Sequence, residues 1–406
     1  MFYEEVQARS LLSKRIVADA WFHSNYSMNV YRGCQFSCAY CDGMAEHYHV
    51  DNFREHVRVK INAPNVLEKE LERILPGRNK SLLDYTELKP EYKRPIIGIS
   101  GGVSDSYQQA EKKYQITRKI LEVLLRHKLP VFLLTKSDLV LRDIDLLEDI
   151  NKQSFASVCF TITLMDENQK KIYEPHSSST EDRFNALKTL RSKGIRGGVM
   201  AMPIIPFIGD SIENMMGIVN ESKKANSEFV LFAGMTLKPG RQKRHFLETL
   251  SRNNPEKLSR IKELYSNENR YGSPYWDKMP VNVMALGHKL CLDEGINPRS
   301  VRHSCPGAYV PNHEVLQVLL DIKYWMSSFL GKSKREWSKF HEGASLIERG
   351  LPNLKTALEM GKLQEQIHPA LLNEVKEILK TGSCETYQRI QAEVNEAARI
   401  EYDRLN

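Results

Sequence analysis

The feature that most constrains this chain is a group of three cysteines in one short stretch near its start. Cys34, Cys38 and Cys41 stand in the segment NVYRGCQFSCAYCD, and they are three of only 7 cysteines in 406 residues. The other four lie far apart, at positions 159, 291, 305 and 384. Three thiols on one loop can surround a common centre, and soft thiolates select zinc, Cu(I) or an iron–sulfur cluster over hard cations. The spacing therefore predicts a metal centre at this loop.

The ligand count helps to distinguish the metals. A structural zinc site has four protein ligands, usually with a second cysteine or histidine pair further along the chain. No second pair follows here, although His47 or His49 could supply one nitrogen at an irregular spacing. A [4Fe-4S] cluster held by only three cysteines leaves one iron without a protein ligand. The sequence favours this cluster, whose open iron is a place for chemistry, and zinc is the alternative.

The spacing C-x3-C-x2-C, with Tyr40 directly before the last cysteine, resembles the signature loop of the radical S-adenosylmethionine (SAM) enzymes. In that superfamily the amino and carboxylate groups of SAM bind the fourth iron. An electron from the cluster then splits the sulfonium to give a 5'-deoxyadenosyl radical, so the cofactors carry the difficult chemistry. The resemblance implies an enzyme with a [4Fe-4S] cluster at Cys34, Cys38 and Cys41. It also implies SAM as a second cofactor and an electron donor of the flavodoxin or ferredoxin type as a partner.

The composition is that of an ordinary soluble protein, with 41% hydrophobic and 27% charged residues. No apolar run approaches the ~18 residues that span a bilayer, and the first residues carry early acids rather than the apolar stretch of a secretory signal. An odd cysteine count with three grouped argues for a reducing compartment. We therefore expect a cytoplasmic protein with no membrane contact. The net charge of +7 permits a polyanionic partner without requiring one.

Short β-rich runs alternate with helical patterns between about residues 27 and 240, which predicts a parallel sheet built from βα units. The expected strands are residues 28–32, 95–100, 130–135, 157–163, 197–202 and 229–233, and the expected helices are 65–75, 109–127, 181–193 and 211–224. Six such units can close partway into a barrel, with the site at the carboxyl ends of the strands. The expected fold class is therefore α/β, a partial (β/α)6 TIM-type barrel. The cysteine loop directly follows its first strand and so belongs at that mouth.

The chain divides into three predicted parts, an N-terminal extension over residues 1–26, the barrel over 27–240, and a helical C-terminal region over 241–406. Strand signals fade after Gly240. Helical patterns follow at residues 282–294, 313–330, 337–349, 370–380 and 385–405. We interpret this region as a helical cap or domain packed on the barrel, whose apolar spacings build core rather than a cofactor site.

Residues at the expected strand ends are candidates for binding SAM. After the second strand, Gly101 and Gly102 let the backbone approach a ligand closely, and the superfamily uses a glycine pair there to contact the SAM amino group. The acidic residue that usually follows the pair is absent, because Val103 stands there, so Asp105 or Glu111 is the candidate in its place. The alternative is a plain tight turn in which Asp105 caps the next helix.

Three further candidates stand at the mouth. Lys136 follows the third strand, and Thr161 and Thr163 end the fourth. A lysine and two hydroxyls could pair with the SAM carboxylate and ribose, whereas the alternative for Lys136 is a solvated charge. Tyr40, inside the cysteine loop, completes the set of cofactor-binding candidates.

Several stretches together resemble one branch of the superfamily, the spore photoproduct lyases and their relatives named DNA repair photolyases. The matching stretches are the cysteine loop, SDSYQQAEKKYQITRKIL, PVFLLTKSDLVLRDIDLL, YEP followed by RFNALKTL, and PIIP. The resemblance covers roughly residues 28–238, with a weaker part over 297–312. It departs at residues 104–107, where SDSY stands in place of the usual TDPY. The resemblance implies a nucleic-acid substrate, DNA or RNA, but a fold alone does not fix function.

Three interpretations of the substrate are open. A nucleic acid is favoured by the basic runs KPGRQKRH (238–245) and RSVRH (299–303), whose cations could hold phosphates near the radical. A small molecule or peptide beneath the helical C-terminal region is the second, because exclusion of water would protect a radical. A zinc or cluster module that binds nucleic acid without catalysis is the third.

A lyase of this branch also needs a hydrogen donor that quenches the product radical, and a cysteine thiol suits that role. Cys305 is the candidate because it stands in the polar loop RHSCPGAY, and Tyr309 is a weaker one. The alternative for Cys305 is a buried, inert thiol.

Overall fold

The computed structural model describes residues 2–75, 86–91, 93–99, 104–267, 269, 271–274 and 278–406. The glycine pair predicted to contact SAM, Gly101 and Gly102, lies outside the described residues. Within the described part of the chain, no helix combines the length and the apolar character needed to cross a membrane.

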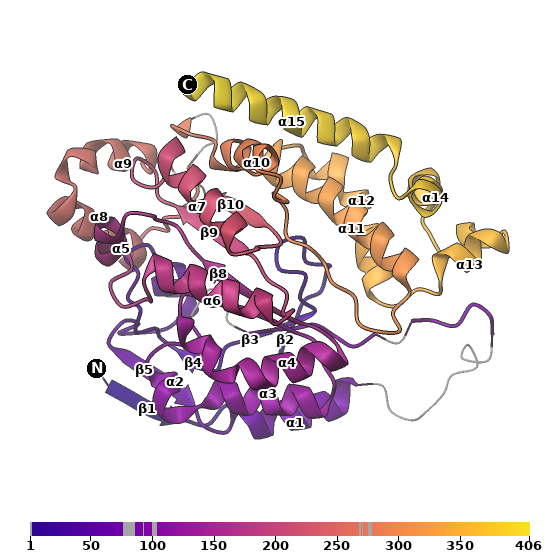
Figure 1. Cartoon of the computed structure of the whole chain (residues 1–406), viewed down its shortest axis with the longest axis horizontal. Helices are drawn as coiled ribbons and strands as arrows, with labels where there is room; N and C mark the ends of the chain where they lie inside the picture. The colour runs from indigo at the N-terminus through magenta and orange to yellow at the C-terminus, as the bar shows by residue number, and fades with distance from the viewer. Residues whose placement is uncertain are drawn as a thin grey trace.

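The centre of the fold is a sheet whose strand order is β10-β9-β8-β7-β6-β3-β2 (Figure 1). Among the described residues, six of its strands run parallel: β3 (Tyr26–Met28), β6 (Ile97–Ile99), β7 (Val131–Thr135), β8 (Ala156–Thr161), β9 (Val199–Ile204) and β10 (Val230–Gly234). The short strand β2 (Ser13–Lys14) pairs antiparallel with β3 at one edge. Runs such as VFLLT in β7 are nearly continuous apolar because parallel strands are covered on both faces. This topology confirms the predicted α/β class and the partial (β/α)6 barrel.

Helices connect the successive parallel strands. They are α2 (Ala110–Tyr114), α3 (Ile116–Arg126), α4 (Ile144–Gln153), α5 (Glu167–Tyr173), α6 (Thr180–Ser192) and α7 (Ile212–Lys224), and a 3-10 turn, Asp138–Asp143, precedes α4. The helix predicted over residues 109–127 is divided at Gln115, which has a φ of 51°. The Glu111 carboxylate accepts the backbone N–H of Thr117 at 3.0 Å. This bond caps the start of α3, so a new helix begins there.

The prediction of the first strand, residues 28–32, was wrong in its limits. Strand β3 ends at Met28, and the chain then crosses to a second sheet of order β1-β5-β4. That sheet consists of β1 (Phe2–Val6), β5 (His56–Lys60) and β4 (Tyr31–Arg32). Helix α1 (Ala63–Ile74) follows β5. The apolar run continues through Val30 and Tyr31, both fully buried, so the sequence alone does not show the change of sheet.

After β10 the described chain is helical. The helices are α8 (Arg241–Asn253), α9 (Leu258–Leu264), α10 (Val283–Asp293), α11 (Val310–Tyr324), α12 (Lys334–Glu348), α13 (Leu354–Glu359), α14 (Leu372–Thr381) and α15 (Glu385–Leu405). Helices α10, α11, α12 and α15 form a layer on one side of the molecule, in which α10 packs on β10 and α12 forms hydrogen bonds with Ala18 and Asn25 close to β2 and β3, whereas α8 and α9 lie apart from it, near α5 (Figure 1). A Cβ on Gly287 of α10 would lie 2.2 Å from the Phe232 ring of β10, so only glycine permits this close packing.

The buried apolar residues form two clusters. The larger one runs from the sheet into helices α10 to α15. The smaller one surrounds the cysteine loop and joins residues of this loop, such as Phe36 and Tyr40, to Tyr173 at the end of α5 and to Phe246 and Leu250 of α8. The cysteine loop is therefore held by a packing unit of its own, between the ends of the strands and α8.

Candidate functional site

The cysteine loop begins at Gly33, directly after β4. Gly33 has a φ of +86°, and a Cβ there would lie 2.5 Å from the carbonyl oxygen of His56, so this position requires glycine. The backbone N–H of Cys34 donates to the carbonyl of Phe53 at 2.9 Å. The side chain of Gln108 donates to the Gly33 carbonyl at 3.1 Å and accepts the N–H of Gln35 at 2.9 Å. The loop is thus fixed to residues 53–56 on one side and to the start of α2 on the other.

The three thiols of this loop are free and close to one another. Cys34 and Cys38 are buried, with 7% and 6% of their surface exposed, and Cys41 is partly exposed. Burial raises the pKa of the Cys38 thiol to about 12. Burial also raises the pKa of Cys34, and the charges of Asp105, Cys41 and Cys38 raise it further. The charges of Cys38 and Cys41 act on Cys34, and the charge of Cys41 acts on Cys38, so the three thiols lie in one region of the loop.

The donor set fits a cluster better than a single ion. Zn–S bonds are ~2.3 Å long, so a zinc ion gathers its ligands tightly. Among the described residues, no three Cys, His, Asp or Glu side chains lie together with the spacing of a single-ion site. Three converging thiols without a fourth ligand are what a [4Fe-4S] cluster with an open iron requires.

A buried carboxylate, Glu174, lies on the inner side of the loop. Its Oε1 accepts hydrogen bonds from the hydroxyls of Tyr40 and Thr163, the latter at 2.9 Å. Its Oε2 forms an ion pair with Arg183 of α6 at 2.8 Å, and at most 1% of either side chain is exposed. Burial alone would raise the pKa of Glu174, but Arg183 and Lys136 lower it to about 2. Glu174 is therefore a charged acceptor that fixes Tyr40 in the loop.

The guanidinium of Arg183 also donates to the carbonyl oxygen of Thr161 at 2.6 Å. The end of β8 is thus tied to the same ion pair as the cysteine loop. No role for Glu174 or Arg183 was predicted from the sequence. The YEP motif marks Glu174, but no spacing rule shows that it meets Tyr40, 134 positions earlier in the chain.

Asp105 and Lys136 lie at the ends of β6 and β7. The Asp105 carboxylate accepts the N–H of Tyr107 at 2.8 Å, the hydroxyl of Thr135 at 2.8 Å and the N–H of Lys136 at 2.9 Å. Burial raises the pKa of Asp105 even though these donors act against it. Its oxygens are occupied by protein donors, so Asp105 joins the loops that follow the two strands.

The ammonium of Lys136 is 5.7 Å from the centre of the Tyr40 ring. It forms no hydrogen bond or ion pair with any described residue. Burial alone would lower the pKa of Lys136, but negative charge at Cys38 and Glu174 raises it. Lys136 is therefore a charged lysine without a protein partner in the described chain, beside the cysteine loop.

Glu111 belongs to a different network. It is fully buried, and its carboxylate accepts hydrogen bonds from the Tyr31 hydroxyl and from the backbone N–H of Thr117. It also forms an ion pair with Arg142 at 2.7 Å. The structure therefore does not bring Glu111 together with Lys136 and the thiols, and its carboxylate caps α3.

Cys305 and Tyr309 lie at the opposite end of the barrel. Cys305 lines a cavity of about 240 Å³ together with Asn25, Ile96 and Phe155, which directly precede β3, β6 and β8. Burial raises the pKa of Cys305 to about 11. The backbone of Tyr309 donates to Glu91, which lines the same cavity. The predicted hydrogen donors thus lie at the amino ends of the strands, whereas the cysteine loop lies at their carboxyl ends.

The described part of the chain forms a parallel partial barrel. The carboxyl ends of its strands carry three converging thiols, a lysine without an ion pair and a buried ion pair. This arrangement is the framework of a cofactor-dependent enzyme. The sequence profile of the radical SAM superfamily matches residues 28–221. The chain belongs to the radical SAM superfamily, and its cofactors are accordingly a [4Fe-4S] cluster and SAM.

Two relatives show how far the similarity extends. The chain is 34% identical over 250 residues to an uncharacterized protein of Methanocaldococcus jannaschii, which covers 61% of this chain and 82% of that protein. It is 28% identical over 268 residues to an uncharacterized protein of Mycobacterium tuberculosis, with 65% and 73% covered.

Solved structures with a similar arrangement include a spore photoproduct lyase mutant, with 16% identity, a TM-score of 0.49, and 67% of this chain and 72% of that chain covered. A cobalamin-binding radical SAM methyltransferase, TsrM from Kitasatospora setae, has 13% identity, a TM-score of 0.41, and 82% and 61% covered. Because both scores are below 0.5, these likenesses carry no weight for the function.

Proposed function

We propose that Cys34, Cys38 and Cys41 hold the [4Fe-4S] cluster and that the enzyme removes hydrogen from a carbon of its substrate. The observation that carries this proposal is the convergence of three thiols, two of them buried and one partly exposed, at the mouth of the barrel, with no fourth ligand beside them in the part of the chain that the structure describes. When bound, the cluster and SAM supply a 5'-deoxyadenosyl radical. The residues of the chain bind and orient these groups and keep water away from them.

Lys136 is the proposed partner of the SAM carboxylate. It carries a positive charge beside the cysteine loop and forms no direct ion pair with a described residue, so a bound carboxylate could accept its N–H donors. Glu174 and Arg183 do not contact SAM in this proposal. They position the residues around it, because they hold Tyr40 and the end of β8 in place. We do not assign a role in the reaction to Cys305 or Tyr309, since they lie at the other end of the strands.

Anaerobic reconstitution with iron and sulfide tests the proposal. The parent protein should bind about four irons, as a [4Fe-4S] cluster requires, and form 5'-deoxyadenosine from SAM when dithionite is the reductant. The variant Cys34→Ala/Cys38→Ala/Cys41→Ala should lose both properties, and Cys305→Ala should keep them. Uptake of one zinc in place of the cluster, or turnover by the triple variant, would contradict the proposal.

The nucleic-acid interpretation of the substrate is favoured by a hollow of about 480 Å³ beside the cysteine loop. Arg9, Arg32, Arg58 and Lys60 line it, and no acidic residue does. The hollow also reaches the mouth, because Asn29 in its wall accepts a hydrogen bond from Ser104 after β6 at 3.4 Å. Several cations without acids form a surface that suits a phosphate backbone. We propose that a nucleic-acid strand approaches the mouth along this hollow.

Binding of single-stranded DNA and RNA at several salt concentrations tests this second proposal. Each phosphate contact contributes about 0.7 to the slope of log Kd against log salt for single strands. Arg9→Gln/Arg58→Gln should therefore lower the slope by about 1.4, whereas Lys334→Gln/Arg335→Gln on α12 should leave it unchanged. Salt-independent binding, together with turnover of a metabolite or peptide, would assign the enzyme to the small-molecule or peptide interpretation.

A further inference from the structure

The basic run at residues 238–245 was a candidate for holding phosphates near the radical, with a solvated loop as the alternative, and the structure places most of it on the outer side of the cysteine loop. Residues from Arg241 onward form α8, which packs directly on the loop. Gln242 donates to the carbonyl of Tyr40 at 2.9 Å, and Phe246 contacts the Tyr173 ring with centroids 5.9 Å apart. Arg244 lies on the opposite, exposed face of the helix. Arg244 and Arg252 of α8 are therefore exposed, whereas Arg241 and Lys243 are half-buried, and Lys243 donates to the carbonyl of Tyr265 at 2.6 Å.

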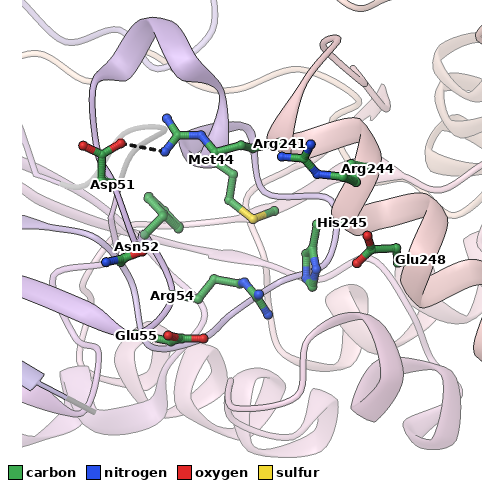
Figure 2. Close-up of a pocket in the computed structure, with 10 residues that line it drawn as sticks. Met44, Asp51, Asn52, Arg54, Glu55, Arg241, Arg244, His245 and Glu248 are labelled. Carbon is green, nitrogen blue, oxygen red and sulfur yellow. Dashed lines mark hydrogen bonds and ion pairs between the residues drawn. The ribbon is translucent and has the colours of Figure 1, made fainter.

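Two adjoining hollows connect this outer face with the cysteine loop. The larger one, about 490 Å³, lies between α8 and the end of the loop (Figure 2). The smaller one, about 350 Å³, shares Arg54, Glu55 and His245 with it, and Ser37 and Ala39 form part of its wall. Ser37 and Ala39 flank Cys38. Solvent thus comes within one residue of a proposed cluster ligand on this side.

The two sides of the cysteine loop have different surroundings. Tyr40 points inward, where Glu174 accepts its hydroxyl and Lys136 lies over its ring. Ser37 and Ala39 instead line the outer hollow, which contains none of the residues proposed to bind SAM. The outer side is therefore close to the cluster ligands and separate from the place where SAM and substrate would meet.

Positive charge is concentrated on this outer side. Residues 241–264, which form α8, a 3-10 turn and α9, contain seven Lys or Arg and three Glu, an excess of four cations in a chain of net charge +7. Arg54 and Arg244 form no hydrogen bond or ion pair with any described residue through their side chains, whereas Arg241 is paired with Asp51 at 3.0 Å. Figure 2 shows Arg54 extending toward His245. Burial, and then the charge of Arg54, lower the pKa of His245.

We propose that this outer surface, formed by Arg54 and the exposed face of α8, is the docking site of an acidic one-electron donor protein with a flavin or an iron–sulfur group. The inference rests on the proposed cluster at the cysteine loop. One electron passes from the reduced group of the donor to the oxidised cluster, so that the donor is oxidised and the cluster reduced by one electron, and no bond forms or breaks. The surface places the donor beside Cys38 without blocking the mouth.

The pattern of charges favours a protein over a nucleic acid at this surface. Glu55 and Glu248 line the same hollows and have no ion-pair partner among the described residues. These acids would repel a phosphate backbone, whereas a folded protein can present both signs of charge in a complementary pattern. The hollow at Arg9 and Arg58 has no acidic residue in its lining, so it suits a nucleic-acid strand better than this surface does.

The experiment compares two reductants on the reconstituted enzyme. The rate of 5'-deoxyadenosine formation is measured at low salt with an enzymatically reduced bacterial flavodoxin and, separately, with dithionite, which needs no docking site. Arg54→Glu/Arg244→Glu should slow the flavodoxin-driven reaction about tenfold, the low end of the range for electrostatic steering. Its dithionite-driven rate should equal that of the parent. Arg54→Gln/Arg244→Gln should give a smaller loss, and high salt should reduce all of these differences.

The matched control is Lys334→Glu/Arg335→Glu, which makes the same charge change at two exposed positions on α12. This control should leave both rates unchanged. An equal loss with both reductants, or no loss with flavodoxin, would overturn the docking site. Loss of nucleic-acid binding with normal flavodoxin-driven turnover would reassign the surface to nucleic acid. Absence of dithionite-driven turnover in the parent would refute the proposed function itself, so the two failures are distinguishable.

Discussion

The buried ion pair behind the cysteine loop leads to a quantitative prediction for Glu174→Gln. Glutamine keeps the shape of the side chain, and its amide oxygen can still accept the hydroxyls of Tyr40 and Thr163. Its NH2 group, however, would face the guanidinium of Arg183, which is 2.8 Å from the present carboxylate oxygen. The substitution therefore leaves a buried positive charge without its counter-ion.

The expected loss of folding stability depends on the hydrogen bonds that Arg183 keeps in the variant. Removing one partner of a buried ion pair costs about 3–5 kcal/mol. Arg183 still donates to the carbonyls of Thr161 at 2.6 Å and Ser179 at 3.3 Å, so we expect the low end, about 3 kcal/mol. This corresponds to a change of about 150-fold in the unfolding equilibrium, since ~1.4 kcal/mol is tenfold.

Urea unfolding of the cluster-free protein, followed by circular dichroism under reducing conditions, measures this difference as a lower midpoint at unchanged slope. Glu174→Gln/Arg183→Met is the decisive companion, because methionine removes the unpaired charge and should restore most of the stability. If Glu174→Gln alone lay within about 0.5 kcal/mol of the parent, or if the double variant were as unstable as the single one, the pair would not have the role given to it here.

Three further predictions concern Lys136, Gly33 and Glu348. Lys136→Gln should raise the KM for SAM about tenfold or more in 5'-deoxyadenosine formation, since a charged hydrogen bond contributes ~1.5–3 kcal/mol; an unchanged KM would exclude the carboxylate contact. Gly33→Ala should reduce iron content after reconstitution, because its Cβ would lie 2.5 Å from the His56 carbonyl at a φ of +86°; an alanine variant with full iron content would show that the loop tolerates the shift. For Glu348, burial alone would raise the pKa, but Arg302 and Lys93 hold it below its ordinary value of 4.5. Its folded-state pKa is depressed, so its stabilisation is present above pH 4.5 and is lost as the pH falls through the folded-state pKa. Glu348→Gln should therefore be less stable than the parent at pH 7, and the difference should shrink below pH 4.5 in urea titrations; a constant difference would contradict this.

The parts of the fold that the sequence predicted correctly are those in which local pattern and final environment agree. The interior of β7 is a continuous apolar run and that of β8 is apolar except for Ser157, and in the structure both strands are largely buried on both faces. The limits of the first strand were wrong because Val30 and Tyr31 are both fully buried, although Val30 lies in the connection to the second sheet and Tyr31 begins β4 of that sheet. The pattern of apolar residues predicts that a residue is buried, but it does not predict in which sheet the residue lies.

The site shows the same limit more sharply. The cysteines could be identified because their spacing carries the chemistry on one loop. Glu174 and Arg183 could not, because their roles depend on contacts with Tyr40 and β8 that only the tertiary fold creates. For Cys305, a polar loop and a thiol suggested chemistry, but only the direction of the strands shows that it stands at the amino end of the barrel. A residue type suggests what a group can do, and topology decides where it can act.

The two faces of the cysteine loop follow from one structural fact, that the loop is a single layer of chain between the barrel and α8. On the inner face, a charged lysine and a buried ion pair lie around Tyr40. Electrostatic interactions of such groups are strongest where water is excluded. On the outer face, the exposed Arg244 and the half-buried Arg54 and Arg241 line open hollows, where charge attracts a partner over a distance without holding it tightly. The proposed reaction needs both a protected radical and repeated delivery of single electrons, and the loop presents these two environments within two residues of the Cys38 thiol. Side-specific substitutions should therefore separate them, with Lys136 changing the use of SAM under any reductant and Arg54 and Arg244 changing only the use of a protein donor.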